Sequence, residues 1–122
     1  MPQTAKIIRT AEAEKMPLGP LSQRQHFTGD ADGLPVLTGI QISQPGYQTK
    51  LHQHPYPEYL FVLEGEMEAW LQGEETTPTR LGPGDMIVLP ANVPHVFRNP
   101  GPTVLRHLGI HTSPTRIVKN VE

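Results

Sequence analysis

The sequence contains no cysteine among its 122 residues. Disulfide bonds and thiolate ligands are therefore excluded, and a bound metal ion would have to be held by nitrogen and oxygen atoms. Long apolar runs are also absent, since stretches such as residues 59–63 are far too short to cross a bilayer. Residues 1–18 lack the continuous apolar core of a secretory signal, so we expect a cytoplasmic protein with no membrane partner.

A strong excess of positive or negative charge is absent as well. The net charge is −2 and no run of Lys and Arg occurs, which argues against nucleic acid as a partner. The turn sequence at residues 82–85 is not followed by Gly-Lys-Ser or Gly-Lys-Thr, so it is not a phosphate-binding loop. We expect a chain of this length to form one domain with a single core.

Glycine and proline are abundant, with 11 and 14 residues respectively. Three Pro-Gly pairs, at residues 45–46, 83–84 and 100–101, predict type II turns. Proline presets φ at the second position of such a turn, and glycine supplies the positive φ at the third. Short β-branched and aromatic stretches separate the turns, and this spacing predicts an all-β sandwich or barrel.

The predicted strands are short and closely spaced. In chain order they are residues 24–28, 34–43, 47–52, 58–64, 67–72, 79–81, 85–89, 95–99, 103–111 and 116–118. Residues 11–15 form the one segment that resembles a helix, of a turn or two. Gly65 is expected to close a tight hairpin between two of the strands.

Several of these strands, including residues 59–63 and 86–89, are apolar on both faces. A sheet with one face in water alternates more cleanly between apolar and polar residues. We therefore expect a second copy of the chain to cover the outer face, giving a homodimer. The alternative is that loops and the N-terminal arm cover it.

The clearest chemical signal is the run from His52 to Glu58, His-Gln-His-Pro-Tyr-Pro-Glu. Residues two apart in a strand point to the same side, so the imidazoles of His52 and His54 can meet at one point. The prolines keep the next segment out of a helix, and Glu58 opens the following strand with the same parity. Two neutral imidazoles and a carboxylate suit Fe, Mn, Ni, Co, Cu or Zn. His95 can complete the site from a neighbouring strand.

These residues belong to two longer motifs that resemble those of the cupin superfamily. The motifs are Gly46-x5-His52-x-His54-x3-Glu58-x6-Gly65 and Gly84-x5-Pro90-x-Asn92-x2-His95-x3-Asn99. The second departs from the family pattern at Asn92, where glycine is usual, but asparagine also tolerates a left-handed turn. The resemblance implies an all-β double-stranded β-helix, the jelly-roll or cupin barrel.

By this resemblance, residues 23–118 form the barrel, residues 1–22 a short N-terminal arm and residues 119–122 a C-terminal tail. All four metal-binding positions of the family are present, and they correspond to His52, His54, Glu58 and His95. We expect one divalent transition metal ion there, with Fe, Mn, Ni, Cu and Zn as the candidates.

The resemblance further implies metal-dependent chemistry on a small molecule inside the barrel. With a redox metal we expect an oxidoreductase, dioxygenase-like, that acts on an enolic or diol-like substrate. Three alternatives stay open. One is Lewis-acid isomerase, decarboxylase or lyase chemistry, in which Glu58 is a candidate base. Another is a non-catalytic module that binds a small ligand around a metal. The third is a structural metal ion that stabilises the barrel without ligand chemistry, which fits Zn better than Fe or Mn.

Three further positions bear on the pocket. Phe97 shares the parity of His95, so we expect it to line the cavity. His107 lies with His111 on one face of a predicted strand and is a candidate pocket base or partner of a metal ligand. The alternative for His107 is a histidine at the barrel rim that bonds a backbone carbonyl. We interpret Tyr56 as packing within its own loop.

Overall fold

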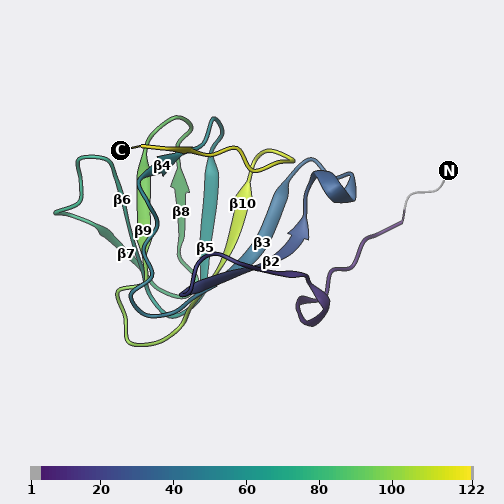
Figure 1. Ribbon diagram of the computed structural model, residues 1–122, viewed down its shortest axis with the longest axis horizontal. Helices are drawn as coiled ribbons and strands as arrows, with labels where there is room; N and C mark the ends of the chain where they lie inside the picture. The colour runs from purple at the N-terminus through teal and green to yellow at the C-terminus, as the bar shows by residue number, and fades with distance from the viewer. Residues whose placement is uncertain (1–3, 122) are drawn as a thin grey trace.

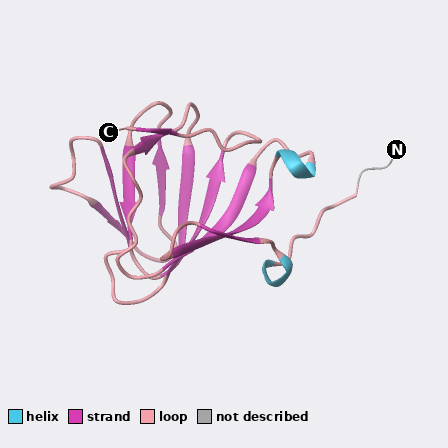
Figure 2. Ribbon diagram, in the orientation of Figure 1, coloured by secondary structure: helices cyan, strands magenta, loops and turns pink. Residues whose placement is uncertain are grey.

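The computed structural model describes residues 4–121, and antiparallel strands account for most of the regular structure in that range (Figures 1 and 2). The only helical elements within the described residues are two single 3₁₀ turns, η1 (Thr10–Glu12) and η2 (Asp30–Asp32). No helix within the described range is long and apolar enough to span a membrane. The N-terminal segment extends away from one side of the barrel, and the C-terminal strand lies at the other (Figure 1).

The strands form two sheets. The larger contains, in spatial order, β1 (Lys15–Pro17), β2 (Ser22–Thr28), β3 (Leu37–Ser43), β10 (Leu105–His111), β5 (Glu58–Glu64) and β8 (Met86–Leu89). The smaller contains β11 (Lys119–Asn120), β4 (His52–Gln53), β9 (His95–Arg98), β6 (Met67–Leu71) and β7 (Thr79–Leu81). This two-sheet arrangement confirms the all-β jelly-roll fold expected from the sequence.

Three expected elements differ from the structure. Residues 11–15 were expected to be helical, but η1 is one short turn and β1 follows it, pairing Lys15 with Gln25 of β2. Residues 47–51 form only an isolated bridge at Gln48 ahead of β4. Residues 116–118 are not a strand, because the backbone groups of Ile117 form hydrogen bonds with side chains and not with a neighbouring strand. Its carbonyl bonds His54 and its N–H donates to the hydroxyl of Tyr56.

Two of the three Pro-Gly turns have the predicted positive φ at glycine, 91° at Gly46 and 90° at Gly84. Asn92 also has a positive φ, 62°, which agrees with the expected left-handed turn at the position where the family usually has glycine. The prediction for residues 100–101 was wrong, since Gly101 is not among the glycines with positive φ. There the N–H of Gly101 donates to the side-chain carbonyl of Asn99 at 3.0 Å, and this contact makes the turn instead.

The two sheets pack their inner faces together around an apolar cluster. Its buried members are Leu60, Val62, Leu89 and Leu105 from the larger sheet and Met67, Ala69, Leu81 and Phe97 from the smaller. Residues that alternate along each strand supply this core, as the period of a β-strand requires. Most of the cluster lies toward one end of the barrel, although Leu89 is the cross-strand partner of Glu58. Polar side chains occupy the inner face at the other end.

Candidate metal centre

The structure brings the four sequence-predicted ligands together at the polar end of the barrel. His52 comes from β4, His54 from the loop after it, Glu58 from the start of β5 and His95 from the start of β9. One potential ligand atom from each residue lies within 4.8 Å of the other three, and all four side chains are buried. His52 and His95 are direct cross-strand partners, which explains how segments far apart in the sequence meet.

Each imidazole is oriented by a backbone carbonyl. The Nδ1 atoms of His52, His54 and His95 lie 2.7, 2.7 and 3.1 Å from the carbonyl oxygens of Lys50, Ile117 and Val93, respectively. A carbonyl can only accept, so Nδ1 must carry the proton in each ring. The Nε2 atoms then carry the lone pairs. This arrangement fixes the tautomer that a metal ligand needs.

Two of these Nε2 atoms are buried without a hydrogen-bond partner among residues 4–121, those of His54 and His95. They lie 3.3 and 3.4 Å from Oε1 of Glu58. Leaving a buried polar atom unpaired costs about 1–3 kcal/mol, so such atoms call for a partner. Burial also lowers the pKa of His52 to about 4, so this ring is neutral near pH 7 and able to ligate. The set of neutral imidazoles and one carboxylate suits a divalent metal ion.

Glu58 is held by a chain of hydrogen bonds on the side away from these two imidazoles. Its Oε2 lies 3.0 Å from Nε2 of His111, and Nδ1 of that ring lies 2.7 Å from the hydroxyl of Tyr56. The hydroxyl in turn accepts the N–H of Ile117 at 3.2 Å. The chain leaves Oε1 directed toward His54 and His95, so it orients the carboxylate for a metal ion.

The charge state of Glu58 follows from the same surroundings. Burial would raise the pKa of its carboxyl, but hydrogen bonding, above all from the Nε2–H of His111, outweighs burial. The pKa is held well below its usual range. Glu58 is therefore a carboxylate at neutral pH, and the site contains one negative charge to offset that of a bound cation.

Sequence analysis did not assign Tyr56 or His111 to the site. Tyr56 was interpreted as loop packing, yet its ring is buried and stacks on His54 with centroids 5.1 Å apart. His111 lies directly opposite Glu58 in the pairing of β10 with β5. The one sequence signal for His111 was that it shares the parity of His107 and so points to the same side of the strand. Which residue of β5 His111 contacts depends on the register between β10 and β5, and a single sequence does not show this register.

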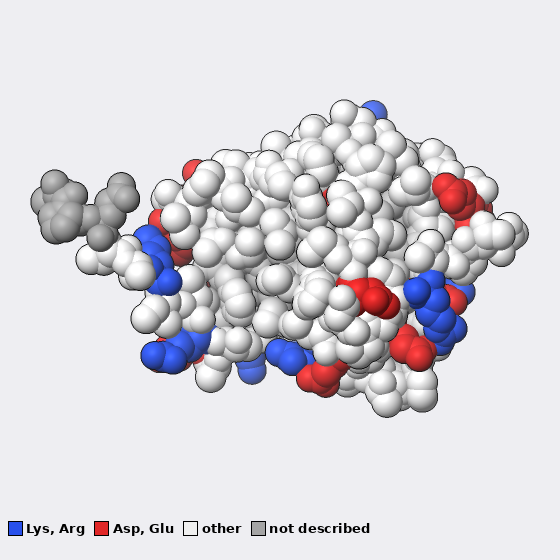
Figure 3. Space-filling view, turned by 180° about the vertical axis from the view of Figure 1, so that it is seen from behind, with Lys and Arg blue, Asp and Glu red and all other residues white. Residues whose placement is uncertain are grey.

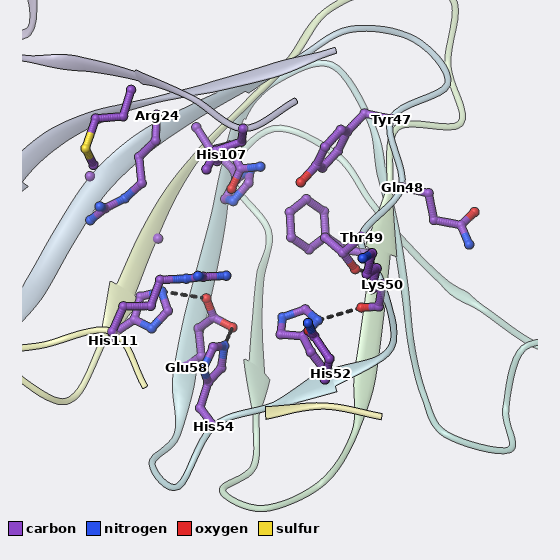
Figure 4. A pocket seen from close by; sticks show the side chains of 18 of the residues that line it. Arg24, Tyr47, Gln48, Thr49, Lys50, His52, His54, Glu58, His107 and His111 are labelled. Atoms are coloured by element: carbon purple, nitrogen blue, oxygen red, sulfur yellow. Dashed lines mark hydrogen bonds and ion pairs between the residues drawn. The ribbon is translucent and has the colours of Figure 1, made fainter. Parts of the chain in front are cut away.

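A cavity of about 530 Å³ adjoins this site, and His52, His54 and Glu58 line it. Both predicted pocket residues, Phe97 and His107, also line the cavity. Figure 4 shows His107 there. His107 and Phe97 meet edge to face there, with ring centroids 5.0 Å apart. The alternative of a rim histidine bonded to a carbonyl does not hold, because His107 is only 1% exposed and its Nδ1 has no partner within the described residues. Burial lowers its pKa to about 4, so the ring is neutral.

Comparisons with known proteins agree with this geometry. The chain is 43% identical over 53 residues to dimethylsulfoniopropionate lyase DddQ of Ruegeria pomeroyi, a match that covers 43% of this chain and 25% of that one. It is 42% identical over 48 residues to quercetin 2,3-dioxygenase of Bacillus subtilis, covering 38% of this chain and 13% of the other. The chain therefore spans only a small part of these curated relatives.

Among solved structures, the polyketide cyclase RemF of Streptomyces resistomycificus superposes with a TM-score of 0.83 at 22% sequence identity. The superposition covers 98% of this chain and 87% of that one, so the two proteins share the whole fold. A family model described as "Cupin domain" matches residues 39–111. The match covers more than half of the sequence and includes both motifs in full. The chain belongs to the cupin domain family.

Proposed function

We propose that the protein is a metal-dependent enzyme that acts on a small molecule held in the barrel cavity. The observation that carries the proposal is the pair of buried, unpartnered Nε2 atoms of His54 and His95 beside the carboxylate of Glu58. His54 and Glu58 line a cavity of about 530 Å³, which is within the range typical of small-molecule sites, about 300–1,000 Å³. A ligand atom above them would reach both the metal position and the cavity walls.

His52, His54, Glu58 and His95 would hold the metal ion. Such an ion supplies a Lewis acid and, if it is redox-active, a path for electrons between a substrate and dioxygen. Tyr56 and His111 keep the carboxylate of Glu58 in place through the hydrogen bonds described above. The walls exclude water from the reacting groups.

A dioxygenase-like activity on an enolic or diol-like substrate is the first reading of this site. The likeness to quercetin 2,3-dioxygenase supports it, because the 48 matched residues are similar to part of an enzyme named for oxygen chemistry. The aromatic wall supports it as well. Phe97 is buried, lies on the same strand as His95 and borders the cavity, so it offers an apolar surface to a flat substrate.

Lewis-acid chemistry without dioxygen is the second reading, and His107 favours it. Its buried ring is neutral and borders the cavity, so it can accept a proton from a substrate. The likeness to a lyase, DddQ, points the same way. In this reading a bound metal ion would supply a Lewis acid, and His107 would receive or orient the substrate proton.

Two measurements test the proposal in sequence. The first is the metal content, by elemental mass spectrometry, of protein purified without a histidine tag or chelator. We expect near-stoichiometric transition metal. The second is oxygen uptake by the Fe(II)-loaded protein with quercetin and with catechols, which the first reading predicts. Substrate conversion without oxygen uptake would favour the second reading. Protein that neither contains a metal nor takes one up on reconstitution would contradict the proposal.

We also infer that a second copy of the chain covers the outer face of the larger sheet. Met86 of β8 is paired with Phe61 of β5, and Phe61 with Leu108 of β10, which gives an apolar row across three strands. Met86 and Val88 are 47% and 51% exposed. Figure 3 shows a broad face whose charged side chains gather at its edges. Light scattering coupled to size exclusion would show a dimer, and a monomer at micromolar concentration would contradict the inference.

A further inference from the structure

One arginine in the cavity has no carboxylate partner among residues 4–121. Arg24 comes from β2 and borders the same cavity as His52, His54 and Glu58 of the metal site. Its one side-chain hydrogen bond within the described residues runs from Nη2 to the carbonyl of Thr38, at 3.2 Å. By contrast, Arg98 and Arg106 on other strands pair with Glu68 and Glu64 at 2.7 and 2.9 Å. Most donors of the Arg24 guanidinium therefore remain available to a ligand.

The fold makes room for this side chain by placing glycine beneath it. A Cβ atom added to Gly39 would lie 3.1 Å from Nε and 3.2 Å from Nη2 of Arg24, and 2.5 Å from the carbonyl oxygen of Gln25. The guanidinium thus lies over a strand position that has no side chain. Gly109 of β10 is the cross-strand partner of Gly39 and also lines the cavity. Two facing glycines leave the inner surface beside Arg24 open.

The charges around the cavity are unbalanced. Arg24, Lys50 and Arg116 line it, whereas Glu58 is the only carboxylate among its described lining residues. Three imidazoles already surround that carboxylate. Burial, followed by repulsion from Arg116, lowers the pKa of Arg24, so the cation lies in surroundings that disfavour its charge. An anion in the cavity would relieve both effects.

Figure 4 shows how these groups are distributed. Arg24 and His111 lie on one wall, Lys50 and His52 lie on the opposite wall, and Glu58 lies at the floor. A ligand that reaches the metal position therefore passes between cationic side chains. A guanidinium matches a carboxylate in shape and charge, since it can donate two parallel hydrogen bonds to the two oxygen atoms.

We propose that the cavity binds small molecules that carry a carboxylate group, and that Arg24 is the residue that holds this group. The part of the inference that places the rest of the ligand at the metal rests on the proposed function. The carboxylate contact itself does not. Arg116 and Lys50, which are exposed at the mouth, add attraction for the anion as it enters. The substrate class is then an organic acid with further oxygen atoms for the metal.

A matched pair of probes separates charge from shape. One is 3,4-dihydroxybenzoate, whose vicinal hydroxyl groups can reach a metal while its carboxylate lies at the far end of the ring. The other is 3,4-dihydroxybenzamide, its neutral counterpart of nearly the same size. Isothermal titration calorimetry gives both affinities, on metal-loaded and on metal-free protein. We expect the acid to bind the wild type at least about tenfold more tightly, as a charge-assisted contact implies.

The variant Arg24→Met removes the guanidinium but keeps an unbranched side chain. We expect it to lose the preference for the acid while it retains the affinity for the amide and the metal content of the wild type. Arg106→Met is the matched control, because it removes one positive charge from the outer face, where Arg106 pairs with Glu64. We expect it to keep the preference. Circular dichroism confirms that each variant is folded.

A second variant protects the test against a folding defect. Arg24→Gln removes the charge but keeps a polar side chain with N–H donors. If Arg24→Met does not fold, Arg24→Gln must lose the preference for the acid. A preference that survives in the folded variant would overturn the proposal, since the metal or another cation would then hold the carboxylate.

The two proposals can fail separately. A wild-type protein that binds metal but does not prefer the acid would overturn the carboxylate inference and leave the metal-dependent function standing. A protein that binds no metal, yet prefers the acid in an Arg24-dependent way, would overturn the metal-dependent function and leave the carboxylate site standing.

Discussion

The two ends of the barrel interior are built from the same strands but differ in chemistry. The inward residues of β5 run from Glu58 at one end to Val62 at the other, and those of β10 run from His111 to Leu105. The alternation of residues along a strand therefore decides which side chains point into the barrel. The position along the strand then decides whether an inward side chain belongs to the apolar core or to the polar site.

The difference extends to how polar atoms are treated. Val62 and Leu105 are 0% exposed and belong to the apolar cluster, so their end of the barrel contributes stability. The other end buries His54 and His95 with unpartnered Nε2 atoms. Such atoms destabilise the fold unless a ligand satisfies them. We expect perturbations at the two ends to separate stability from metal binding.

The largest separation is expected for His95→Ala. Removing one ligand should lower metal affinity by more than the 10- to 100-fold that is typical for loss of a residue behind a ligand. The metal-free barrel should stay folded, because no hydrogen bond between strands is lost. His26→Ala is the control, since His26 pairs with Asp32 and is not among the cavity residues. Equal metal contents in the two purified variants would contradict the site.

The opposite result is expected for Leu105→Ala at the apolar end. Leu105 is fully buried in the core cluster, so the cavity left behind should lower the free energy of unfolding by about 2–5 kcal/mol. Metal stoichiometry under native conditions should not change. Urea denaturation measures the first quantity and elemental analysis the second. Leu21→Ala, at a residue that is 40% exposed, should shift stability by less than about 0.5 kcal/mol.

Acid should weaken the fold through His107, which lies between the two ends. Its pKa falls from 6.5 to about 4 on folding, so the unfolded chain takes up a proton first as the pH drops. This residue alone should remove up to about 3 kcal/mol of stability from the metal-free protein between pH 6.5 and 4, and nothing above pH 6.5. Urea midpoints for wild type and His107→Leu across this range test it. Parallel pH profiles would rule out the contribution.

The smallest effect is expected for Tyr56→Phe, which removes only the hydroxyl that bonds Nδ1 of His111. Glu58 would then be less firmly oriented, so metal affinity should fall about tenfold and stability by about 1 kcal/mol. Tyr59→Phe removes a hydroxyl from a half-buried residue of β5 outside the cavity. The comparison fails if both variants bind metal equally well in a competition assay with a chromophoric chelator.

Much of the fold and the four metal-site positions could be predicted from the sequence, because their signals are local. The bounds of β5 and β7 agree with the prediction, since turn residues enclose short apolar runs. His52, His54 and Glu58 lie within one short segment, so strand parity alone places them together. The turn at Asn92 was equally predictable from its conformational tolerance.

The partners of Glu58 and the exposed donors of Arg24 could not be predicted in this way. His111 meets Glu58 only through the register of β10 against β5, two strands more than forty residues apart in the sequence. Arg24 reaches the cavity because Gly39 on another strand leaves space for it. In both cases the deciding contact is between distant segments, and no local pattern marks it.

The glycine pair beside Arg24 also bears on how this barrel can change its ligand. A methyl group at Gly39 would collide with the carbonyl of Gln25, but one at Gly109 would meet only Gly39 O and Leu60 Cδ2, both at 3.9 Å. Ala at position 109 is therefore sterically allowed, and larger residues would extend into the cavity from the same point. A single substitution at position 109 can therefore narrow the cavity and shift ligand specificity toward smaller molecules. It would leave the four metal-site residues unchanged.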